Sequence, residues 1–127
     1  MVTVLLVSAA ERKRDLVLAS LTEAGLEAAC LQDVSKLVNP PDQPPRLVIV
    51  DVPSLSQAQV EAAFERSKTW QVPVVMLLSP ENLGDQKLLQ RADDFILEPV
   101  RPLETATRIR RLLRRGTEEQ SLHLVKI

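Results

Sequence analysis

The sequence predicts an α/β fold, a three-layer sandwich around a five-stranded parallel sheet, and three observations lead to it. Five short apolar runs recur along the chain, at residues 2–7, 26–31, 46–52, 72–78 and 94–98. Most lack the alternation of a strand with one wet face, which indicates strands buried on both sides. Helix-like stretches separate the runs, and strands that alternate with helices form parallel sheets covered on both faces.

A helix signal follows the first apolar run. Ser8, with Glu11 three residues later, is a capping box and predicts that a helix begins there. Gly25 predicts the end of that helix. The second run is more polar, which places it nearer a sheet edge, and residues 33–39 predict a short helix. A stiff proline-rich connection follows, at Pro40, Pro41, Pro44 and Pro45.

Two further helix starts lie in the middle of the chain. Ser56 begins a second capping box and predicts a helix to about Trp70. Ser79 before Pro80 is typical of an N-cap followed by proline at the first helical position. The helix that starts there is of uncertain extent and runs to about Arg91, with a short or frayed form expected.

The last predicted helix covers residues 102–115, and Gly116 is expected to end it. Its predicted buried side consists of Leu103, Ala106, Ile109 and Leu113. A polar stretch follows, and residues 121–127 then regain apolar character. We therefore divide the chain into a domain at residues 1–115 and a segment at 116–127, interpreted as a linker and the first strand of a downstream domain.

Handedness rules fix the expected order of the strands. Right-handed crossovers lead to a doubly wound, flavodoxin-like sheet with the order 2-1-3-4-5. Ligands bind such sheets where the order reverses, outside the carboxyl ends of the first and third strands. Ser8 follows the first strand and Asp51 ends the third, so the two side chains should meet in that crevice.

Composition excludes several classes of function. The net charge of -1 gives no bulk attraction to nucleic acid or to an acidic membrane. The chain has no 18-residue apolar run and no signal-peptide pattern, so we expect a cytoplasmic protein without membrane contact. Cys30 is the lone cysteine and is expected to be a small core residue rather than a reactive thiol. No nucleotide-binding loop, CxxC pair or nucleophile elbow is present, and we expect no enzymatic activity.

Four segments resemble the receiver domain of bacterial two-component response regulators, in the family order and with near-family spacing. They are residues 47–51, 72–79, 92–99 and 102–115. The last of them is similar to the final receiver helix of the winged-helix transcription-factor subfamily, the OmpR/PhoB type. The resemblance covers about residues 1–115 and implies a role in phosphorelay signal transduction and transcription regulation.

The resemblance assigns a role to each residue of the crevice, and two of the four roles are lost. It makes Asp51 the phosphoacceptor and Ser79 the hydroxyl that contacts the phosphate. The acidic pair that holds Mg²⁺ in the family falls on Ser8 and Ala9, and the conserved lysine falls on Glu98. Two carboxylates about 6 Å apart repel by roughly 3 kcal/mol at an effective dielectric of about 20. We therefore expect an atypical receiver without efficient aspartyl phosphorylation, with no cofactor and no bound Mg²⁺.

In this interpretation Asp51 is a vestigial carboxylate at a strand end. Two rival interpretations of the crevice remain open. In the first, the pocket is still phosphorylatable, with a cation from Lys87 or Arg101 in place of the missing lysine. In the second, the altered crevice is a small-molecule or metal-binding sensor.

The resemblance also implies a two-fold dimer through the helix before residue 92, the strand at 94–98 and the last helix. The residues that match this homodimer interface are Lys87, Asp94, Glu104, Arg108, Arg111 and Arg115. Phe95 occupies the position of the family's switch aromatic, with a buried core phenylalanine as the alternative. A cis Glu98–Pro99 bond is implied as well. Possible partners are a histidine kinase or another protein, and DNA only through a downstream domain.

Overall fold

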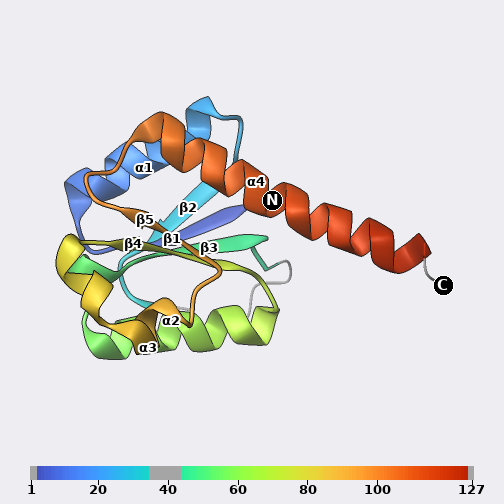
Figure 1. Cartoon of the computed structure of the whole chain (residues 1–127). Coiled ribbons are helices and arrows are strands. Elements are labelled where there is room, and N and C mark those ends of the chain that lie inside the picture. Colours follow the sequence, from blue (N-terminus) through green and yellow to red (C-terminus); the bar gives the residue numbers. More distant parts are fainter. Residues whose placement is uncertain (1–2, 35–43, 126–127) are drawn as a thin grey trace.

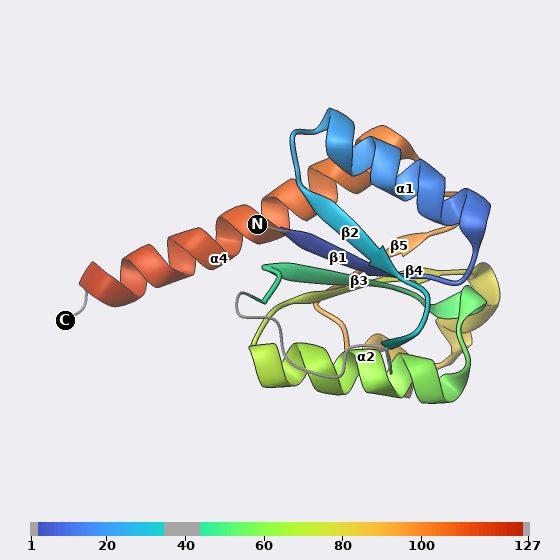
Figure 2. The same ribbon diagram turned by 180° about the vertical axis from the view of Figure 1, so that it is seen from behind.

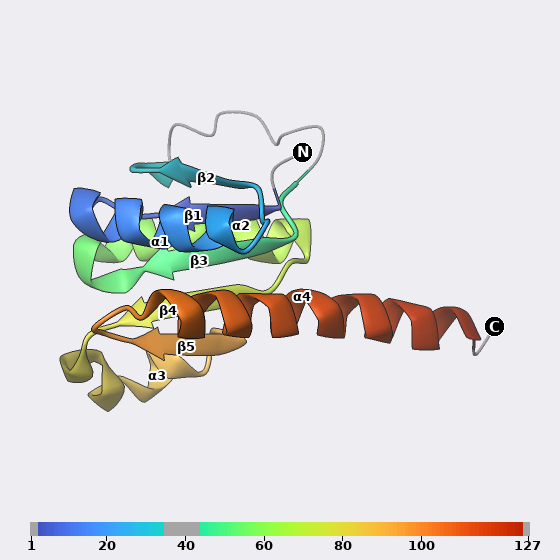
Figure 3. The same cartoon turned by 90° about the horizontal axis from the view of Figure 1, so that it is seen from above.

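Helices on both sides cover a five-stranded parallel sheet with the order β2-β1-β3-β4-β5 (Figures 1 and 3). The strands are β1 (Val4–Val7), β2 (Ala28–Leu31), β3 (Leu47–Asp51), β4 (Val74–Leu78) and β5 (Asp94–Leu97). The helices are α1 (Glu11–Glu23), α2 (Gln57–Trp70), α3 (Gln86–Leu89) and α4 (Pro102–Val125), with 3-10 segments η2 (Val52–Ser54) and η3 (Pro80–Gly84). This computed structural model describes residues 3–34 and 44–125, and beyond Arg114 only the backbone path. The predicted fold class and strand order are confirmed.

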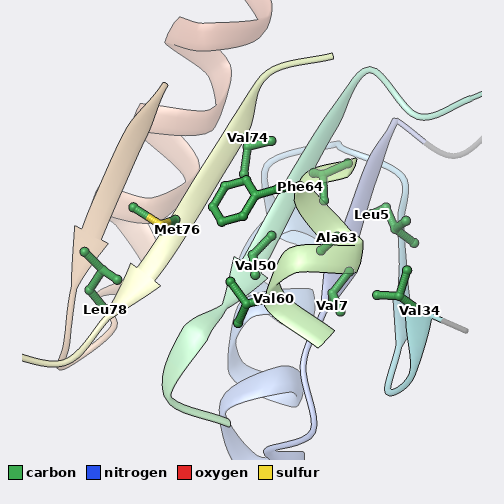
Figure 4. Close-up of a cluster of buried hydrophobic side chains, with 11 residues drawn as sticks. Leu5, Val7, Val34, Val50, Val60, Ala63, Phe64, Val74, Met76 and Leu78 are labelled. Carbon is green, nitrogen blue, oxygen red and sulfur yellow. The ribbon is translucent and has the colours of Figure 1, made fainter. Parts of the chain in front are cut away.

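Alternate residues of β3, the central strand, pack into two separate hydrophobic cores, one on each face of the sheet. Val50 of β3 packs with Phe64 of α2 on one face (Figure 4). Ile49, its neighbour, packs on the other face with Val17 of α1 and Ile109 of α4. Figure 2 shows the same two layers, with α1 and α4 on one side and α2 on the other. Each such side chain contributes roughly 1.5–3 kcal/mol when fully buried, which is why the strand is apolar on both faces.

Helix caps follow the sequence at Ser56, Gly25 and Ser79, the last with Pro80 in the first turn of η3, and depart from it at Ser8. Ser56 accepts a hydrogen bond from the N–H of Gln59 at 3.2 Å and caps α2 as predicted. Gly25 has φ of 78° and follows α1, also as predicted. The capping box at Ser8 is wrong, because α1 begins at Glu11 with Ala10 as its N-cap and no side-chain cap. The Ser8 hydroxyl instead donates a hydrogen bond to Asp51.

The segment between β4 and β5 holds little helix. It consists of η3 and a single turn of α helix, α3, which agrees with the expected short or frayed helix. Arg91, which follows α3, has no positive φ. It forms an ion pair with Glu61 and lies 4.5 Å from the ring centroid of Phe64. These contacts hold the end of the segment against α2.

Helix α4 is longer than predicted and runs past Gly116 to Val125. Its C-terminal half extends beyond the sheet (Figures 1 and 3). One glycine inside a helix costs only about 1 kcal/mol, and the residues around Gly116 support helix formation. Residues 121–125 are thus helical rather than a strand, while a domain after this segment stays a prediction. Leu103 is 81% exposed instead of buried, whereas Ile109 is buried as expected.

Helices α1 and α4 lie side by side on the same face of the sheet (Figure 3). The Arg110 guanidinium donates a hydrogen bond at 2.8 Å to the carbonyl oxygen of Ala24, the C-cap residue of α1. This contact ties the end of the first helix to the middle of the last one.

In the described ranges, no helix is long and apolar enough to cross a membrane. The short helix predicted at residues 33–39 falls almost entirely outside those ranges, as do Pro40 and Pro41.

Candidate functional site

The crevice at the carboxyl ends of β1 and β3 brings Ser8 and Asp51 together. Val7 is the register partner of Val50, so the residues that follow them, Ser8 and Asp51, are neighbours. The Ser8 hydroxyl donates to Asp51 Oδ2 at 2.7 Å. Asp51 is 0% exposed, so its carboxylate is removed from water and depends on protein partners.

A lysine from helix α1 supplies the charged partner. Lys13 Nζ donates to Asp51 Oδ1 at 2.7 Å and also forms an ion pair with Glu98. Glu98 follows β5, and the Glu98–Pro99 bond is cis, as the resemblance implies. One ammonium group therefore joins the ends of two strands to the first turn of α1.

The predicted uncompensated repulsion between the two carboxylates is wrong, because Lys13 stands between them. The charges of Asp51, Glu98 and Lys13 add to -1 - 1 + 1 = -1 rather than -2. Burial by itself would lower the pKa of Lys13, but hydrogen bonds to Asp51 and Glu98, with their charges, raise it above 10.5. The lysine is therefore a stable cation at neutral pH.

Lys13 was missed by the sequence analysis, although a signal for it was present. The residue lies four positions before Val17 and eight before Leu21, both of which are buried. These three residues share one helical face, and that face turns toward the sheet. A lysine at the first position of a buried stripe, one turn from the crevice, points its ammonium toward the strand ends.

The remaining pocket positions serve local structure. The N–H of Ala9 donates to Ser54 Oγ at 3.0 Å, and Ser54 Oγ donates at 3.0 Å to the carbonyl oxygen of Asp51. The Ser79 hydroxyl donates to Asn82 Oδ1 at 3.0 Å and so belongs to the start of η3. The structure thus gathers Ser8, Asp51, Glu98 and the unpredicted Lys13, and leaves Ser79 bound to its own segment.

This arrangement does not fit the Mg²⁺ site that the resemblance implies. Both oxygens of Asp51 already have partners, and Ser8 and Ala9 stand where carboxylate ligands are needed. Mg²⁺ binds through carboxylates and retained water in near-octahedral geometry. No group of three or more His, Cys, Asp or Glu in the described ranges could hold a metal.

A second surface lies on β5 and α4. Arg108 contacts Asp94 at 3.4 Å and Glu104 at 3.3 Å within the chain. These residues line an open cavity of about 600 Å³, and Arg101, Leu103, Thr107, Arg111 and Leu112 line it as well. Phe95, also on β5, is 38% exposed, so the buried-core alternative for it is wrong.

Two predicted interface residues do not share that cavity in the described structure. Lys87 lines a separate groove of about 780 Å³ between α2 and the η3–α3 segment. The side chain of Arg115 lies outside the described part of the chain. In the described structure neither Lys87 nor Arg101, the cations of the rival phosphorylatable pocket, contacts Asp51, and the cation beside it is Lys13.

Cys30 lies on β2, half-buried rather than fully within the core. Its Sγ is 4.0 Å from the carbonyl oxygen of Ser8. Burial raises the pKa of the Cys30 thiol, which keeps it protonated at neutral pH. A thiol in that state is a poor nucleophile, in line with a packing role.

Comparisons with known proteins point to one kind of domain. No protein-family model matches the sequence. Protein RcaC of Microchaete diplosiphon is 36% identical over 75 residues, which are 56% of this chain and 11% of that protein. NtrX from Brucella abortus superposes with a TM-score of 0.84 at 26% identity, over 98% of this chain and 30% of that one. The receiver domain of NtrX gives a TM-score of 0.75 at 28% identity, over 87% of this chain and 98% of that domain.

The chain thus spans about a tenth of RcaC and less than a third of the NtrX chain. The match to the longer NtrX chain covers more of this protein than the match to the isolated domain, 98% against 87%.

Proposed function

We infer that this chain, a response-regulator receiver domain by its fold, is a regulatory interaction module that does not accept phosphate efficiently at Asp51. The observation that carries the proposal is the Lys13 ammonium between Asp51 and Glu98. Hydrogen bonds and an ion pair to both oxygens lower the nucleophilicity of the carboxylate that must attack the donor. Here Oδ1 is held by Lys13 and Oδ2 by Ser8.

Charge around the acceptor supports the same proposal. Phosphoryl transfer depends on cations that neutralise the transferring oxygens. A single ammonium already shared by two carboxylates leaves no surplus positive charge for a phosphoryl group. Glu98 would then repel the added group at short range. This adds to the reason expected from sequence: the pocket keeps a net charge of -1, and both oxygens of the acceptor are engaged as well.

Intact mass after incubation with acetyl phosphate and MgCl₂ tests the proposal. The wild-type chain should keep its unmodified mass. A restored variant, Ala9→Asp with Glu98→Lys and Lys13→Ala, recovers an acidic ligand and a lysine at the family positions and should gain one phosphate. Asp51→Asn in the restored background should abolish that gain. Ready formation of a phosphate adduct on wild-type Asp51 would overturn the proposal.

One observation favours a second candidate, a receiver that is still phosphorylatable through a rearranged pocket. Lys13 provides a cation next to the acceptor, although from α1 rather than from the end of β5. This candidate requires Lys13 to leave Glu98 and follow the phosphate. The same mass measurement separates the two, because the second candidate predicts an adduct on the wild-type chain that Lys13→Ala removes.

The second part of the proposal is that the domain transmits its signal by binding a partner protein. We place a homodimer interface on β5 and α4, where Arg108 lies between Asp94 and Glu104. A two-fold contact needs a self-complementary patch, and this face combines both signs of charge with the exposed side chain of Leu103. A histidine kinase or another protein is the alternative partner, and no enzymatic activity is proposed.

We also propose that the domain is part of a longer protein. RcaC and NtrX extend well beyond the matched stretch, which fits a receiver joined to further domains. We propose transcription regulation through a downstream DNA-binding domain of the OmpR/PhoB type. Helix α4 would then act as a helical connector in place of the predicted linker and strand.

A further inference from the structure

We propose that the Lys13 side chain is the resident cation of this pocket and that it makes the folded state independent of divalent metal ions. The inference deepens the proposed function, because it concerns the same pocket, but it does not require that function to be correct. It concerns the charge balance of the unmodified chain, with no phosphate present.

The geometry supports a replacement of the metal rather than a simple surface ion pair. The ammonium contacts carboxylates from the ends of β3 and β5 at once, and the Lys13 side chain is only 19% exposed. The amine is bound to Asp51 Oδ1 and the Ser8 hydroxyl to Oδ2. A metal ion at this carboxylate would therefore compete with the amine for the same buried charge.

The burial of the Asp51 carboxylate explains why a cation must lie next to it. Asp51 is fully buried, and its other partner, the Ser8 hydroxyl, is neutral. A buried carboxylate without a charged partner is strongly destabilising. Lys13 is the cation in contact with Asp51 in the described ranges, so it carries this compensation.

A tethered cation has an advantage over a dissolved one. Lys13 belongs to α1, so its binding to Asp51 is intramolecular and does not depend on metal concentration. Mg²⁺ loses its water reluctantly and would have to displace the amine from Oδ1. Removal of the amine should uncover a pocket of two carboxylates, Asp51 and Glu98, open to a divalent ion.

The experiment compares thermal unfolding in EDTA and in millimolar MgCl₂, without a phosphodonor, and follows Mn²⁺ binding by electron paramagnetic resonance. The set contains the wild type, Lys13→Ala, the charge-preserving Lys13→Arg, and Arg12→Ala as an exposed neighbour on the same helix. For the wild type, Lys13→Arg and Arg12→Ala, the unfolding temperature of each protein in EDTA should equal its unfolding temperature in MgCl₂.

Lys13→Ala should unfold at a lower temperature in EDTA and recover several degrees in MgCl₂. Its Mn²⁺ affinity should exceed that of the wild type by at least about tenfold. Adding Glu98→Gln should remove this gain. The proposal is contradicted if Lys13→Ala shows no gain in Mn²⁺ affinity, or if the gain persists after Glu98→Gln is added.

A wild-type result alone can also overturn it, so the test does not depend on the folding of Lys13→Ala. If the wild type binds Mn²⁺ and Asp51→Asn does not, the pocket holds a metal in spite of Lys13. This outcome is distinct from failure of the proposed function, because a chain can bind Mn²⁺ and still form no phosphate adduct.

Discussion

A single side chain decides the chemistry of the crevice. Lys13 satisfies a fully buried carboxylate, neutralises part of the charge of Glu98 and links α1 to β3. Its partners are 38 and 85 positions away in the sequence, so no local pattern identifies them. The local signals around Ser8 favoured a helix cap, and the tertiary hydrogen bond to Asp51 prevailed over that role.

Lys13→Met should be strongly destabilising. It removes one partner of a buried pair and leaves the Asp51 carboxylate without a charged neighbour, which costs about 3 kcal/mol at the lower end of the usual range. Urea unfolding measures the change. Adding Asp51→Asn should recover part of the loss, because the orphaned charge disappears. Stability of Lys13→Met equal to that of Arg12→Met would show that the pair contributes nothing.

Alkaline pH should weaken the fold through the same residue. The folded-state pKa of Lys13 is raised above 10.5 by its two carboxylate partners, despite the opposing effect of burial. The stability from a raised pKa is complete below the unfolded value and is lost as pH rises through the folded value. The free energy of unfolding should therefore fall above about pH 10.5 in the wild type. Lys13→Met should lack this component, and identical alkaline profiles for the two proteins would exclude it.

At the scale of elements, the sequence located the strands better than the helix ends. Apolar runs of strand length identify all five strands, and the three inner strands β1, β3 and β4 are buried along their whole length. Helix ends depend on single residues. Gly116 was predicted to end α4, but the helix continues through it to Val125. Glycine is common after helices, yet its modest cost inside one is easily outweighed.

Gly116→Ala tests whether α4 continues through this position. In a continuous helix the change should stabilise the local helix by about 1 kcal/mol and raise the far-ultraviolet helical signal. Gly116→Pro should have the opposite effect, with a cost near 3 kcal/mol. If Gly116 instead adopted a left-handed conformation at a helix end, Gly116→Ala would lower stability, so the sign of the effect decides.

At the scale of the whole molecule, topology placed Asp51 beside Ser8 without any side-chain information. The strand order alone requires this neighbourhood at the switch point between β1 and β3. The same reasoning could not orient surface residues. Leu103, in the first turn of α4, was expected inside and is exposed. Exposure at β5 and α4 is what makes an interface there worth testing.

Arg108→Glu should weaken self-association of the chain. The change places three acidic groups together on the proposed interface, at Asp94, Glu104 and position 108. We expect the dimer dissociation constant to rise at least about tenfold, equivalent to 1.4 kcal/mol. Sedimentation velocity over a concentration series measures it, with Arg12→Glu as a control of equal charge change away from the face.

Exchanging the charges, Asp94→Arg with Arg108→Asp, should restore association if the two residues meet across a two-fold axis. A wild-type chain that sediments as a monomer at every concentration would rule out this interface.

The first helix is fastened at both of its ends. Lys13 anchors its start to the segment after β5, and the carbonyl of Ala24 anchors its finish to Arg110 on α4. These contacts couple the position of α1 to both the end of β5 and helix α4. A partner that displaces α1 would therefore disturb the contacts of Glu98 and Arg110 together.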